Sequence, residues 1–99
     1  MDLKGKHKKQ LEKKARILKA MAHPIRLCII RNLIDTGGSN VSHIQECLMQ
    51  PQSTISQHLY KLKAAGIING KRKGTEITYK VINDDAIKLA YLLFPEEAV

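Results

Sequence analysis

Residues 42–81 constrain the fold of this chain most, because the hydrophobic periodicity changes from helical to strand-like within them. Ser42 followed by Gln45 is the pattern of a capping box, which predicts a short helix over residues 42–48. A turn ending at Pro51 follows. A longer helix is predicted over residues 52–65. It should stop there because the next residue, Gly66, can adopt the left-handed conformation that ends many helices. Two helices joined by a tight turn form a helix-turn-helix.

Beyond Gly66 the pattern is that of a β-hairpin. Residues 67–69 are strand-like, and residues 77–81 alternate apolar and polar side chains as a half-buried strand does. Between them Lys71, Arg72 and Lys73 precede Gly74, which predicts a basic hairpin tip with the turn at the glycine. A basic hairpin directly after a helix-turn-helix is the wing of a winged helix.

Three further helices complete the prediction. An amphipathic helix is expected over residues 11–22, and a largely apolar one over residues 24–35 with Pro24 at its first position. A last helix should begin near Asn83, with Asp84 and Asp85 at its positive end, and stop at Pro95. The predicted fold is mainly α with a small β-hairpin, in the order α-α-α-α-β-β-α. Residues 11–95 form one domain, and residues 1–10 form a basic tail for which disorder stays an open alternative.

The charge balance points to a polyanionic partner. Seventeen Lys and Arg against nine Asp and Glu give a net charge of +8, which suits nucleic acid or an acidic membrane surface. No apolar run approaches the length of a membrane span, and the N-terminus lacks the apolar core of a signal peptide. We therefore expect a cytoplasmic protein that binds double-stranded DNA and no membrane, with Cys28 and Cys47 as free thiols.

The helix over residues 52–65 carries the residues expected to contact DNA. Its apolar residues Ile55, Leu59 and Leu62 predict a buried stripe, and short polar side chains cluster at its N-terminal end. Such side chains bond to base edges in the major groove. The residues predicted for base contacts are Gln52, Ser53, Thr54, Ser56 and Gln57, with Lys61 and Lys63 for phosphates. Simple capping of a surface helix is the alternative.

Two further features have competing interpretations. Lys71, Arg72 and Lys73 are expected at phosphates or in a minor groove, although a plain solvated hairpin stays open. His58 lies beside the apolar stripe, so a structural histidine is favoured over a base contact.

Two segments resemble the ArsR/SmtB family of winged-helix repressors. Residues 18–27 (LKAMAHPIRL) are similar to that family's entry into its second helix, and residues 51–62 (PQSTISQHLYKL) to its recognition helix. The resemblance covers roughly residues 12–94. It implies a repressor that binds an imperfect inverted repeat as a homodimer through its first and last helices. The matching apolar residues are Leu11, Leu18, Met21, Ile87, Tyr91 and Phe94, which could instead cover the monomer's own core.

The resemblance also raises the question of a sensor, because many relatives release DNA on binding metal or oxidising thiols. The paired cysteines and the Asp–His sets of those relatives are absent here, so no metal and no cofactor is expected. His43 and Cys47 offer only two potential ligands, and a Cys28–Cys47 redox pair is a lesser alternative to Cys28 as a core residue. A metal- or thiol-responsive repressor therefore stays an alternative.

Other classes of function fit less well. No nucleotide-binding loop, nucleophile motif or complete metal site supports an enzyme. A protein-interaction module would favour an apolar surface over a polar helix and a basic tip. Single-stranded RNA binding usually uses aromatic platforms, and here only Tyr60 is expected on the basic face.

Overall fold

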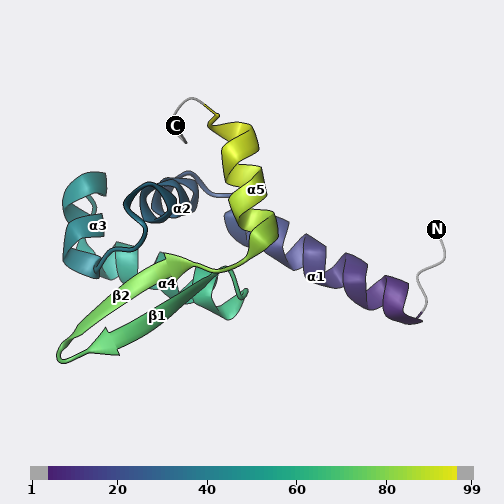
Figure 1. Cartoon of the computed structure of the whole chain (residues 1–99), viewed down its shortest axis with the longest axis horizontal. Helices are drawn as coiled ribbons and strands as arrows, with labels where there is room; N and C mark the ends of the chain where they lie inside the picture. The colour runs from purple at the N-terminus through teal and green to yellow at the C-terminus, as the bar shows by residue number, and fades with distance from the viewer. Residues whose placement is uncertain (1–4, 96–99) are drawn as a thin grey trace.

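A computed structural model describes residues 5–95, which form five helices and one hairpin. Figure 1 shows their arrangement. The order and type of the elements match the predicted mainly α winged helix-turn-helix. Their bounds are α1 Gly5–Met21, α2 Pro24–Thr36, α3 Val41–Leu48, α4 Gln52–Ala64, β1 Ile68–Lys73, β2 Glu76–Val81 and α5 Asp84–Leu93.

Helix α1 begins at Gly5, earlier than the predicted start at residue 11. Residues 6–10 contain Lys, His and Gln, and Lys and Gln are good helix formers, but these residues carry no apolar side chain from which a periodicity could be recognised. Residues 5–10 therefore belong to the helix, whereas the first four residues of the predicted tail lie outside the described residues. The N-terminal half of α1 extends away from the body of the molecule (Figure 1).

Helix α2 lies at the centre of the core. His23 caps its N-terminus by accepting a hydrogen bond at Nδ1 from the Ile25 N–H (3.1 Å), and Pro24 occupies the first turn as predicted. One side of the helix is fully buried against α3, α4 and the hairpin. The largest fully buried side chains of the molecule are Ile29, Ile30, Leu33, Ile44, Ile55, Leu62, Ile67 and Ile68.

The predicted capping box of α3 is wrong. Asn40 is the N-cap, and its Oδ1 accepts a hydrogen bond from the His43 N–H (2.8 Å). Ser42 is exposed within the first turn. Asparagine caps as well as serine does, so two capping candidates two residues apart compete, and the extended backbone at residue 40 decides between them. The helix ends at Leu48 as predicted, followed by Met49 in the left-handed conformation (φ 53°).

The wing is longer than predicted. Strands β1 and β2 pair antiparallel from Ile68 opposite Val81 to Lys73 opposite Glu76, with the turn after Lys73. Lys71, Arg72 and Lys73 therefore lie in β1 and not in the turn. Gly74 has φ 66°, as tight two-residue hairpin turns require. Ser39 pairs with Tyr79 by two backbone hydrogen bonds (2.8 and 3.1 Å), which attach the hairpin to the α2–α3 loop.

Candidate nucleic-acid interface

Helix α4 has one buried and one exposed side. Ile55, Leu59 and Leu62 are at most 2% exposed, so the predicted buried stripe is confirmed. Of the residues predicted to contact bases, all but one are exposed: Gln52, Ser53, Ser56 and Gln57. Thr54 is half-buried, because it lies at the border between the exposed side and the buried side of α4. Lys61 and Lys63 are both exposed.

The exposed polar side chains share one face of α4. With about 100° per residue, Ser53, Ser56 and Tyr60 fall within about 60° of one another around the helix axis. Gln52 and Gln57 border them. We call these five residues the recognition face. Tyr60 is 73% exposed, in agreement with the expectation that it lies on the basic face, although it was not among the residues predicted to contact DNA.

The first helix of the pair holds α4 in place. Ile44 of α3 is fully buried, and the left-handed Met49 reverses the chain so that α4 can begin three residues later, at Gln52. The Pro51 carbonyl accepts the first hydrogen bond of α4 from the Ile55 N–H (3.1 Å). The recognition face therefore stands on a rigid, well-packed support.

The wing lies next to the N-terminal end of α4. Gln52 and the wing residues 75–77 line one groove of about 330 Å³. Asn40, which caps α3, also donates a hydrogen bond from Nδ2 to Glu76 Oε1 (2.9 Å). A single asparagine thus ties the helix pair to the wing.

The three wing cations are all exposed, as a DNA contact requires. Alternation along β1 places Lys71 and Lys73 on one face of the hairpin and Arg72 on the other. Gly70 precedes them at a crowded point, because a Cβ there would lie 2.9 Å from Ile77 Cγ2 and 3.0 Å from Tyr79 Cε1.

His58 has a structural environment, which agrees with the favoured interpretation. Its Nδ1 accepts a hydrogen bond from Arg26 Nε (3.1 Å), and its ring lies 4.4 Å from that of His23. Burial lowers the pKa of His58, and electrostatic interaction with His23, Arg26 and Lys61 lowers it further. The neutral ring is therefore the form that fits between α4 and the start of α2.

The residues predicted for a dimer interface divide into three groups. Leu18 (54%) and Tyr91 (45%) are exposed, and Leu11, Ile87 and Phe94 are half-buried. Met21 is only 4% exposed and packs in the core of the single chain, so it does not belong to an exposed face. The helical period did not distinguish it from Leu18, because α1 has a buried side and an exposed apolar side.

Helix α5 exposes two leucines that were not predicted. Leu92 and Leu93 are 74% and 55% exposed, beside Tyr91. The sequence pattern favoured Tyr91 and Phe94, because they lie on the same helical stripe as Ile87. Phe94, however, packs within the single chain: the Arg31 guanidinium carbon lies 5.3 Å from the centroid of its ring.

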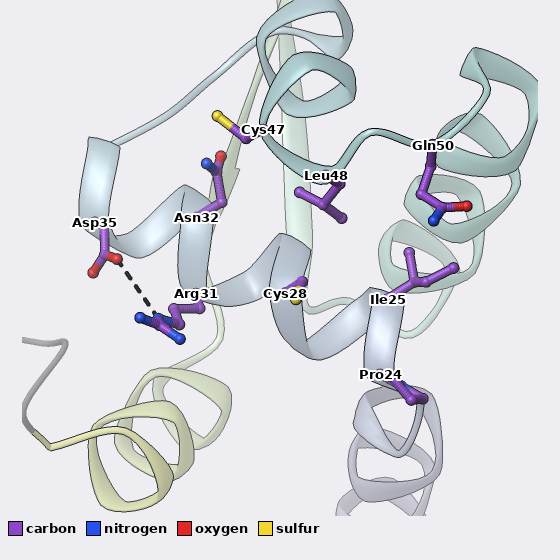
Figure 2. Close-up of a pocket in the computed structure, with 9 residues that line it drawn as sticks. All are labelled: Pro24, Ile25, Cys28, Arg31, Asn32, Asp35, Cys47, Leu48 and Gln50. Carbon is purple, nitrogen blue, oxygen red and sulfur yellow. Dashed lines mark ion pairs between the residues drawn. The ribbon is translucent and has the colours of Figure 1, made fainter.

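A groove of about 410 Å³ lies between α2 and α3 and is lined by both cysteines. Figure 2 shows the residues that line it. The thiols are free, as expected. Cys28 is exposed and is not the core residue that was predicted, because an α2 that is apolar nearly all round gives no sign of which side faces solvent. Cys47 is exposed too, with Sγ 3.7 Å from His43 Nε2. Within residues 5–95, no three His, Cys, Asp or Glu side chains are grouped as a metal site would need.

The helices in the described part of the chain are too short or too polar to cross a bilayer. These elements together define a winged helix-turn-helix protein. The polar recognition helix α4 follows the supporting helix α3 in the chain, and the basic wing follows α4.

The comparisons with known proteins identify the family. The family model described as bacterial regulatory protein, arsR family, matches residues 23–70. The transcriptional repressor PagR of Bacillus anthracis is 41% identical over 85 residues, which cover 86% of this chain and 85% of PagR. The chain belongs to the arsR family, which confirms the resemblance found in the sequence.

Solved structures agree with this assignment. The crystal structure of PagR has a TM-score of 0.82 at 40% identity, covering 87% of this chain and 98% of that one. HlyU from Vibrio cholerae has a TM-score of 0.82 at 30% identity, covering 88% of this chain and 94% of that one.

Proposed function

We propose that this protein is a sequence-specific DNA-binding transcriptional regulator that represses its target genes in the cytoplasm. The observation that carries the proposal is the recognition face, which is exposed and polar while the opposite side of α4 is fully buried. Similarity to proteins named as transcriptional repressors, PagR among them, supports repression in particular.

The recognition face suits the major groove of a duplex. Glutamine can bond bidentately to adenine and serine to several base edges, so Gln52, Ser53, Ser56 and Gln57 would supply sequence preference. Lys61 and Lys63 would bind phosphates, which position the helix without selecting a sequence. The wing cations Lys71, Arg72 and Lys73 would hold the backbone or the minor groove beside it.

A homodimer fits the apolar surface that the single chain leaves uncovered. Leu18 of α1 and Tyr91, Leu92 and Leu93 of α5 are all exposed, and neighbouring large exposed apolar side chains such as the three on α5 mark interaction sites. In Figure 1 the N-terminal half of α1 extends away from the body, next to no other element. Two such chains would bury these helices against each other and present two recognition helices to one operator.

Selection of bound fragments from random duplex DNA tests the proposal. We expect enrichment of an imperfect inverted repeat whose half-sites lie about 10 base pairs apart, centre to centre. RNA of the same sequence is the control and should bind far more weakly, because the major groove of A-form RNA is too narrow for α4. Absence of any enriched sequence, or equal affinity for the RNA, would contradict the proposal.

A further inference from the structure

A second groove runs along α4 on the side that faces α1. It has a volume of about 260 Å³ and is lined by side chains from α1, α2 and α4. Its charged members are Arg16, Lys19, Arg26 and Lys61, and the remaining described lining residues are Tyr60 and alanines. The described lining therefore contains four cations and no carboxylate. We call this site the basic groove.

Two of these cations have no other partner among the described residues 5–95. Arg16 and Lys19 are exposed, and within residues 5–95 neither forms an ion pair. Arg26 differs, because it donates hydrogen bonds from Nε to His58 and from Nη1 to the Ala20 carbonyl oxygen (3.0 Å). Arg26 thus fastens the end of α1 to α4 and keeps Arg16 and Lys19 beside the recognition helix.

The basic groove is continuous with the recognition face. Tyr60 belongs to both, and Lys61 lies at the same edge of α4. The other edge begins at Gln52, which lines the groove shared with the wing. A duplex laid against α4 therefore meets the wing at one edge and the α1 cations at the other.

We propose that Arg16 and Lys19 bind backbone phosphates of the duplex, so that α1 is a second flank of the DNA-binding surface opposite the wing. The proposal rests on the proposed function. B-form DNA carries one negative charge per about 1.7 Å of its axis, so phosphates flank any groove that α4 occupies. Arginine binds phosphate through a planar fork, and lysine binds it as a point charge.

The salt dependence of binding tests this role. Each phosphate contact contributes about 0.9 to the slope of log affinity against log salt concentration. The double variant Arg16→Gln, Lys19→Gln should therefore bind with a slope less steep by about two units for each bound protomer. Lys88→Gln on α5 removes an exposed cation remote from α4 and should keep the wild-type slope. The variant in which the two cations are exchanged (Arg16→Lys, Lys19→Arg) should retain most of the wild-type salt slope.

Several results would overturn the inference. A wild-type slope in the double variant, or an equal loss in Lys88→Gln, would show that Arg16 and Lys19 bind no phosphate. A double variant that sediments as a monomer, where the wild type sediments as a dimer, would assign the groove to the partner chain instead. Failure of the wild-type protein to bind any duplex would reject the proposed function itself, which is a distinguishable outcome.

Discussion

At the scale of single residues, His58 connects the recognition helix to its support. The neutral ring accepts a hydrogen bond from Arg26 and packs on His23, and its pKa is lowered by burial and by electrostatic interaction with His23, Arg26 and Lys61. A proton on Nδ1 would break that hydrogen bond and add a charge to a cationic cluster. The residue therefore makes the support of α4 sensitive to acid.

Stability should consequently fall below neutral pH. In the unfolded chain His58 takes up a proton near pH 6.5, whereas the folded chain takes it up only at lower pH. The stability that the neutral His58 ring gives the fold is complete above about pH 6.5, and it is lost as the pH falls toward and through the folded pKa. Thermal unfolding of His58→Gln should show a shallower decline between pH 7.5 and 5 than the wild type. His7→Gln, on exposed α1, is the control, and an equally steep decline in His58→Gln would contradict this account.

Residue roles were predictable where a helix has one buried side. The stripe of Ile55, Leu59 and Leu62 followed from spacing alone, because the rest of α4 is polar. Cys28 and Met21 were assigned to the wrong environments, because α2 is apolar nearly all round and α1 is apolar on two sides. Which side of such a helix faces solvent depends on packing partners that are distant in the sequence.

At the scale of elements, the wing is a paired arm and not a loose tip. Strand β1 holds Lys71, Arg72 and Lys73 at fixed positions opposite β2, and Ser39 anchors the base of the hairpin to the α2–α3 loop. A cation held in a strand gives a phosphate contact of defined geometry.

Lys73→Ala should weaken binding to all duplexes alike. Loss of one phosphate contact should reduce the salt slope by about one unit for each bound protomer, with little change in sequence preference. Binding titrations over a range of salt concentrations on operator and random DNA would measure both effects. Lys88→Ala is the matched control. A slope unchanged by Lys73→Ala would remove the wing from the DNA-binding surface.

The existence of every described helix and strand could be predicted, but some of their boundaries could not. The β1 strand extends through three cations that resemble a loop, because pairing with β2 outweighs their low strand propensity. Asn40 could not be chosen over Ser42 as the cap of α3, since the backbone angle and the bond to Glu76 become visible only in three dimensions.

At the scale of the whole molecule, the single chain leaves apolar helix surface exposed. Its extents are 46 × 31 × 22 Å, with α1 extending beyond the body (Figure 1), and α5 exposes three large apolar side chains. An ion pair between Lys14 and Asp85 joins the two helices, and its hydrogen bond lowers the pKa of Asp85. Helices α1 and α5 thus form one connected surface suited to a second copy.

Leu92→Asp should disrupt that dimer. Burying an unpaired carboxylate in an apolar interface is costly, so the variant should sediment as a monomer at micromolar concentration where the wild type sediments as a dimer. Met49→Asp introduces the same charge at another exposed apolar residue, in the α3–α4 turn, and should leave the dimer intact. A monomeric wild type, or a dimeric Leu92→Asp protein, would contradict the assignment of α1 and α5.

The affinity of Gln52→Ala and Ser56→Ala proteins for the selected operator and for random duplex DNA tests the central claim most directly. If α4 contacts base edges, each substitution should weaken operator binding by about 1–3 kcal/mol and leave binding to random DNA nearly unchanged. Gln10→Ala, at an exposed position of α1, should change neither. Equal losses on both kinds of DNA, or no loss on the operator, would show that the exposed polar side of α4 does not select the sequence.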